Sequence, residues 1–68
     1  MNLFQALENG YNLLKTNNIN SYKIDAELLL SDSLNISKER LILNLKRVIN
    51  NDTYNNFLLK INRRKAKE

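Results

Sequence analysis

The N-terminal part of the chain carries apolar residues at spacings of three and four, which is the period of one face of an α-helix. The stripe consists of Leu3, Ala6, Leu7, Gly10, Leu13 and Leu14. It predicts an amphipathic helix over residues 2–15. Gly10 falls inside the stripe, where its missing side chain lets another backbone approach, so we interpret it as a packing residue.

A second helix is predicted from residue 22 to about residue 33. Ser21 is a suitable N-cap, because its hydroxyl can accept a hydrogen bond from a backbone N–H that has no partner within the helix. Apolar residues occupy most of the helix circumference, namely Ile24, Ala26, Leu28, Leu29 and Leu30. We therefore expect this helix to be the most buried one of a small bundle.

A short third helix is predicted from Ser37 to about residue 44. Ile36 precedes the cap and Leu41 follows it, a spacing that allows a hydrophobic staple across the helix start. The stretch 45–48 predicts either a further helical turn or a loop.

The last helix begins after Asn50, where Ile49 and Tyr54 repeat the staple spacing. Its apolar face is formed by Tyr54, Phe57, Leu58 and Ile61. Because no segment alternates apolar and polar residues as a strand would, the pattern predicts an all-α fold, a single bundle of four to five short helices spanning residues 1–68.

Composition excludes several kinds of chemistry for this 68-residue chain. It contains no cysteine and no histidine, so disulfides, thiolate or histidine metal sites and imidazole bases are excluded, and one glycine cannot build a phosphate-binding loop. We expect no catalytic, cofactor-binding or metal-binding residue in this chain. The longest apolar run is Leu28, Leu29 and Leu30, and no signal-peptide layout opens the chain, so we expect a cytoplasmic protein without a membrane segment.

The formal net charge of +4 directs attention to the last helix, where basic residues recur on the face opposite the apolar one. They are Lys60, Arg63, Arg64 and Lys67. Such a stripe is either a solvated face or a surface for a protein or nucleic acid. No base-stacking aromatic residue interleaves with it, so a single-strand platform is not favoured, and the helix that starts at Ser37 is a weak candidate for a DNA-reading helix.

Asp25 and Glu27 are the only close acidic pair within a predicted helix. Since residues two apart on a helix point in different directions, these two carboxylates cannot act as a catalytic pair. Two interpretations of Asp25 stay open: it pairs with Arg63 or Arg64, or it faces solvent in the first helical turn, where the helix dipole favours a carboxylate.

Three segments, taken in order, resemble a known family: residues 25–29 (Asp-Ala-Glu-Leu-Leu), residues 37–43, and residues 63–68, which begin with Arg-Arg. The chain resembles the N-terminal domain of peptide chain release factor glutamine methyltransferases, the N5-glutamine methyltransferases of the HemK/PrmC family. Tyr22 stands where that family often has proline, and Lys67 stands where it often has glycine. Neither difference alters the expected fold.

The resemblance implies that the chain is the substrate-recognition domain of an enzyme that uses S-adenosylmethionine to methylate the glutamine of the Gly-Gly-Gln loop in release factors. It implies a separate catalytic domain after Glu68, so this chain alone would be inactive, and it implies a monomer that contacts the release factor and that catalytic domain. Candidate contact residues are Asp25, Lys60, Arg63, Arg64 and Lys67. The rival hypothesis is a small basic helical protein that binds nucleic acid.

Overall fold

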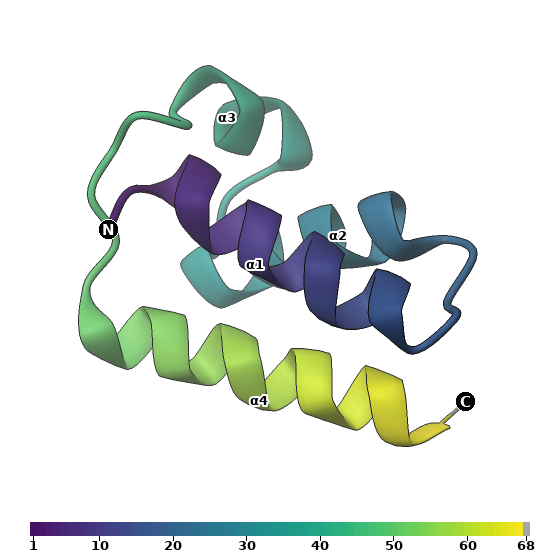
Figure 1. The fold of residues 1–68 in the computed structure, drawn as a ribbon. Helices are drawn as coiled ribbons and strands as arrows, with labels where there is room; N and C mark the ends of the chain where they lie inside the picture. Colours follow the sequence, from purple (N-terminus) through teal and green to yellow (C-terminus); the bar gives the residue numbers. More distant parts are fainter. Residues whose placement is uncertain (68) are drawn as a thin grey trace.

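The computed structural model of the protein describes residues 1–67, and the side chains of residues 1–66. Within this range the chain forms four α-helices and no strand, which confirms the all-α prediction (Figure 1). The helices are α1 (Leu3–Thr16), α2 (Tyr22–Leu34), α3 (Lys38–Leu43) and α4 (Asn51–Lys67). No helix in this part of the chain has both the length and the apolar character needed to cross a membrane.

Three of the helices pack on one another and the fourth lies at the edge of the bundle. α1, α2 and α4 are in mutual contact, while α3 packs on α2. Figure 1 shows α1 and α4 running side by side in the same direction, with α2 behind them and α3 on the side away from α4. The two longest helices, α1 and α4, are thus joined through one shared core.

The core forms where the apolar stripes of α1, α2 and α4 meet. Its fully buried large side chains come from every helix: Leu3, Leu14, Leu30, Leu41, Phe57 and Ile61. Gly10 lies at the centre of this arrangement, because a Cβ atom built on it would lie 2.6 Å from Cζ of Phe57 and 3.4 Å from Cβ of Ala26. Its role in packing is confirmed, but the neighbour that fills its space is the ring of Phe57 on α4.

The expectation that α2 is the most buried helix is wrong. α2 does contact all three other helices. Its outer stripe is nevertheless uncovered, since Ile24 is 54% exposed and Leu28 is 52% exposed, and α1 contributes more buried residues than α2. Apolar residues around most of a helix therefore do not ensure burial on every side.

The start of α3 and the start of α4 are capped as the sequence predicts. The backbone N–H of Arg40 donates to the hydroxyl oxygen of Ser37 over 3.2 Å. The N–H of Thr53 donates to the side-chain carbonyl oxygen of Asn50 over 2.7 Å. Each bond satisfies a backbone donor that has no partner within its own helix.

The residues predicted to form the hydrophobic staples lie in or against the core. Leu41 and Ile49 are buried, and Ile36 and Tyr54 are partly buried and pack against the same cluster. The apolar residues beside the two caps therefore tie the beginnings of α3 and α4 to the bundle.

The other two helix starts differ from the prediction. Ser21 does not cap α2 with its side chain, and its hydroxyl donates instead to Oδ2 of Asp25 over 2.8 Å. At α1, Asn2 forms a capping box with Gln5, in which each side chain accepts from the backbone N–H of the other residue. The helix therefore begins at Leu3, one residue later than predicted.

The stretch 45–48 is a turn followed by an isolated antiparallel bridge between Asn2 and Val48. Of the two predicted alternatives, a further helical turn or a loop, the structure therefore has the loop. Backbone hydrogen bonds line this bridge: Leu3 N–H donates to the carbonyl oxygen of Arg47 over 2.8 Å, and Ile49 N–H donates to that of Met1 over 3.0 Å. The first residues of the chain are thus fixed beside the segment that leads into α4.

Candidate functional site

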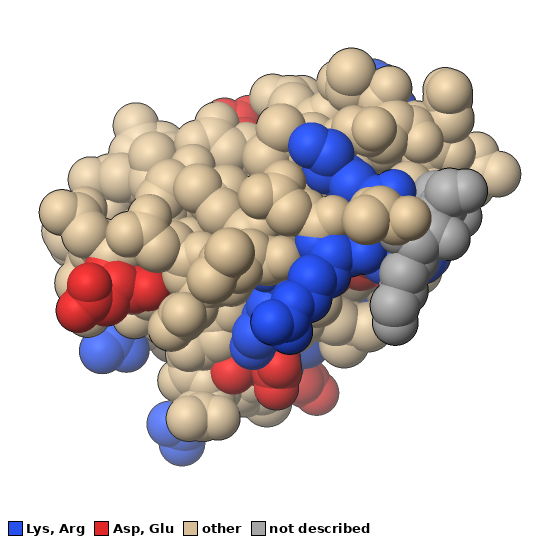
Figure 2. Space-filling model, turned by 90° about the horizontal axis from the view of Figure 1, so that it is seen from below, with Lys and Arg blue, Asp and Glu red and all other residues tan. Residues whose placement is uncertain are grey.

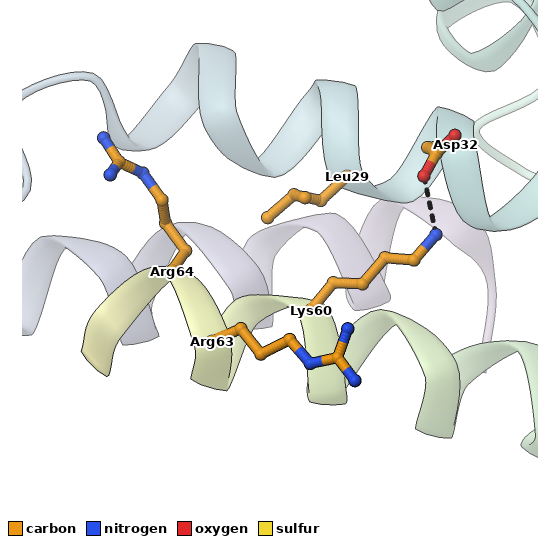
Figure 3. Close-up of a pocket in the computed structure, with 5 residues that line it drawn as sticks. All are labelled: Leu29, Asp32, Lys60, Arg63 and Arg64. Carbon is orange, nitrogen blue, oxygen red and sulfur yellow. Dashed lines mark hydrogen bonds and ion pairs between the residues drawn. The ribbon is translucent and has the colours of Figure 1, made fainter. Parts of the chain in front are cut away.

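A groove between α2 and α4 brings together most of the predicted contact residues (Figure 3). It has a volume of about 300 Å³ and is lined by Leu29, Asp32, Lys60, Arg63 and Arg64. Figure 2, which views the molecule from the α4 side, shows lysine and arginine side chains in a band across this face, with acidic side chains beside it. The side chain of Lys67, the remaining predicted contact residue, lies outside the described part of the structure, as does Glu68.

Asp25 pairs with Arg64, so of its two interpretations the ion pair with a cation of the last helix is correct and the solvent-facing carboxylate is not. Nε of Arg64 lies 2.8 Å from Oδ2 of Asp25, whose side chain is only 19% exposed. Burial by itself would raise the pKa of Asp25, but the hydrogen bonds from Arg64 and Ser21 and the charge of Arg64 outweigh it, so the pKa lies below its ordinary value. The pair connects the start of α2 to the last turns of α4.

Lys60 forms a second link between the same two helices. Its ammonium lies 2.7 Å from Oδ2 of Asp32, and the two groups are drawn at one end of the groove in Figure 3. The Asp32 side chain is 70% exposed, so water screens this ion pair much more than it screens the pair of Asp25 and Arg64.

Arg63 is arranged differently from its neighbour Arg64. It is exposed and makes no ion pair with the described residues, and Figure 3 shows its side chain lying along α4 without reaching across to α2. Of the three described cations in the groove, Arg63 is therefore the one whose charge is available to a partner.

Glu27 connects three helices on the other side of α2. Its carboxylate accepts from the hydroxyl of Tyr11 over 2.8 Å and lies 3.2 Å from the ammonium of Lys38. Burial is the largest cause that raises the pKa of Tyr11 well above its ordinary range, and the hydrogen bond to Glu27 and the negative charge of Glu27 raise it further. Asp25 and Glu27 thus point to different helices, as their spacing predicts, whereas nothing in the sequence pattern singles out Tyr11.

Comparison with known proteins relates the chain to a family. Residues 5–68 match the PrmC N-terminal domain family. The chain belongs to that family. No curated protein and no solved structure matches it.

The match spans nearly all of this PrmC N-terminal domain, from the first turn of α1 through α4. It confirms the resemblance to the N-terminal domain of release factor glutamine methyltransferases and indicates that the domain is part of a PrmC-type methyltransferase. Two of the segments that carry the resemblance meet in the fold, because Asp25 of Asp-Ala-Glu bonds to Arg64 of Arg-Arg. In this domain the two motifs therefore hold α2 and α4 together.

A second surface of the PrmC N-terminal domain includes α3, which the sequence indicated only as a weak candidate for a DNA-reading helix. We call it the α3 surface and define it as Arg40, Ile42, Leu43, Lys46, Arg47 and Val48. All six side chains are exposed. The sequence feature that indicates exposed apolar residues here is the run Leu41, Ile42 and Leu43, since three consecutive apolar residues on a helix cannot all face one core.

Proposed function

We propose that this domain is the release-factor recognition module of a cytoplasmic protein-(glutamine-N5) methyltransferase, which methylates the glutamine of the Gly-Gly-Gln loop. The observation that carries the proposal is the match to the PrmC N-terminal domain family over residues 5–68. Methyl transfer belongs, in this proposal, to a separate catalytic domain of the parent enzyme. The module acts as a monomer and contacts both the release factor and that catalytic domain.

The described residues do not fit S-adenosylmethionine, the methyl donor that the proposal requires. Glycine-rich loops let a backbone approach such a cofactor closely, but the one glycine of this chain, Gly10, faces the buried ring of Phe57. We therefore assign the cofactor to the catalytic domain and derive no chemical step from this chain.

A recognition role suits the way the bundle is held together. The links from Asp25 to Arg64 and from Glu27 to Tyr11 and Lys38 join all four helices around a common core. A domain fixed in this way does not have to order its backbone on binding, which lowers the entropic cost of association.

The test is a titration of the 68-residue chain against a purified peptide chain release factor, run beside a nonspecific DNA duplex at moderate salt. We expect saturable binding to the release factor and none to the duplex. A chain that binds neither partner counts against the proposal. Loss of release-factor methylation when this domain is deleted from the parent enzyme, with retained cofactor binding, is the expected result in the complementary assay.

Binding of nucleic acid is the second candidate function. It is favoured by the net charge of +4 and by exposed cations that make no ion pair with the described residues, such as Arg63, Arg40 and Arg47. Because such binding releases counterions from the phosphates, duplex affinity that falls steeply with salt, without affinity for the release factor, would support it.

A further inference from the structure

The α3 surface owes its exposure to the shortness of α3. Leu41 is the residue of this six-residue helix that is buried, and it faces α2 and the core. Ile42 and Leu43 follow it at successive steps of about 100° around the helix axis, which turns both away from the core. No described element lies over them, because α3 packs on α2 at the edge of the bundle (Figure 1).

The apolar part of the α3 surface is the most exposed apolar part of the described chain. Leu43 is 82% exposed and Val48 is 74% exposed, the two highest values among its large hydrophobic residues, and Ile42 is 47% exposed. Beside them lies a shallow hollow of about 460 Å³, lined by Lys38, Glu39, Ile42 and Leu43. A single exposed leucine is ordinary, but several exposed aliphatic residues on one short segment are typical of an interaction surface.

The segment that carries these apolar residues is also rich in cations. Residues 38–47 contain four basic residues and one acidic residue, a net charge of +3, which is most of the +4 of the whole chain. Lys38 is paired with Glu27, whereas Arg40, Lys46 and Arg47 make no ion pair with the described residues. This contrasts with α4, where Lys60 and Arg64 are bound to carboxylates of α2.

We propose that the α3 surface docks an acidic amphipathic segment of the protein substrate, with its apolar side chains over Ile42 and Leu43 and its carboxylates beside Arg40, Lys46 and Arg47. This inference rests on the proposed function and names the face that carries it out. The paired cations of the α2–α4 groove hold the helices together, and the α3 surface supplies the charge and the apolar area that a partner can use.

The combination of side chains favours a protein over the other anionic partners. A nucleic acid offers phosphates to the cations but no apolar counterpart for Leu43 and Val48, and residues 38–48 contain no aromatic side chain on which a base could stack. A membrane surface usually takes a long amphipathic helix with bulky apolar residues, whereas α3 extends only from Lys38 to Leu43.

The experiment measures the affinity of the 68-residue chain for a purified release factor and compares Leu43→Ser with Leu28→Ser. Both positions are exposed leucines, but Leu28 lies on the outer stripe of α2. Removing a leucine that becomes buried in the complex should weaken binding by about tenfold or more, because that burial contributes more than about 1.4 kcal/mol, the equivalent of tenfold. Leu28→Ser should bind as the wild type does, and equal melting temperatures establish that both variants are folded.

The charge part of the inference is tested with Glu39→Gln and Arg47→Gln. Glu39 is the acidic residue that lines the hollow, so removing its charge should tighten binding of an acidic segment by a few-fold, whereas Arg47→Gln should weaken it. Lys23→Gln, which removes an exposed cation from α2, is the control and should leave the affinity unchanged.

The outcomes separate this inference from the proposed function. If the wild-type chain binds the release factor and Leu43→Ser binds equally well, the inference is overturned while the proposed function stands. If the wild-type chain does not bind the release factor, both fail. Binding to phosphatidylserine–phosphatidylcholine vesicles or to duplex DNA that depends on Leu43, without release-factor binding, would reassign the surface to those partners and overturn the inference as well.

Discussion

Replacing Gly10 with alanine tests whether the close contact at the centre of the bundle limits its stability. The new Cβ would lie 2.6 Å from Cζ and 3.2 Å from Cε2 of the Phe57 ring. Carbon atoms in contact are normally about 3.5–4.0 Å apart, so the ring would have to retreat by roughly 1 Å. Phe57 is fully buried, so its ring would have to move against the other side chains of the core.

Two effects of opposite sign decide the free energy of unfolding of Gly10→Ala. Alanine is the better helix former by about 1 kcal/mol, whereas forcing extra volume into a packed core costs about 1–3 kcal/mol. Because the atom contacted is a buried ring, we expect the steric cost to be larger and the variant to be destabilised by about 1 kcal/mol. In a domain of this size that corresponds to a melting temperature lower by about 4–8 °C.

The assay is thermal and urea unfolding followed by far-UV circular dichroism. Asn12→Ala, an exposed substitution on the same helix, is the control and should stabilise slightly through helix propensity alone. In a Phe57→Leu background the ring is absent, so adding Gly10→Ala there should be neutral or stabilising. The reasoning is refuted if Gly10→Ala is as stable as the wild type, or if it costs the same with and without the ring.

Three further predictions concern charges and caps. Asp25→Asn should destabilise the domain by about 1 kcal/mol at pH 7, since the carboxylate is mostly buried while Arg64 keeps some contact with water. The pKa of Asp25 is lowered by folding, so the unfolded chain takes up this proton at a higher pH than the folded chain does. The difference in stability from the wild type should therefore be full above about pH 4 and shrink as the pH falls through the folded-state pKa. In urea unfolding, a difference that grows as the pH falls below about 4 would contradict the assignment. Asn50→Ala should lower stability by about 1 kcal/mol through loss of the cap of α4, a result that thermal melting can check. Lys60→Gln should change stability by less than about 0.5 kcal/mol, because its partner Asp32 is mostly exposed, and a larger loss would show that the ion pair is stronger than its exposure suggests.

Local sequence signals predict the helices of this domain well. Ser37 and Asn50 are followed by helices that begin where their caps place them, because capping depends on residues only a few positions apart. Ser21 shows the limit of such signals: its backbone, with φ −90° and ψ 29°, lacks the extended conformation of the caps at Asn2 and Ser37, and its hydroxyl donates to the Asp25 carboxylate without accepting a cap bond.

Features that depend on the packing of distant segments were predicted only in part. The sequence indicates that Asp25 can pair with a cation of the last helix, but the choice of Arg64 over Arg63 depends on how α4 is rotated against α2. In the same way, the exposure of Ile24 and Leu28 depends on which sides of α2 other helices cover. The α3 surface was not predicted, although a short third helix was, because the sequence does not show that α3 packs on α2 at the edge of the bundle and leaves Ile42 and Leu43 uncovered.

The bridge between the N-terminus and the segment before α4 has a consequence for folding kinetics. Hydrogen bonds from Ile49 to Met1 and from Leu3 to Arg47 close a loop that contains α1, α2 and α3. A disulfide would keep this loop closed in the unfolded chain, but hydrogen bonds break on unfolding and let the loop open. The chain therefore loses the entropy of loop closure each time it folds. Most other contacts in a helical bundle are local and form quickly, and this contact between distant residues should therefore form late and slow the folding of an otherwise fast-folding domain.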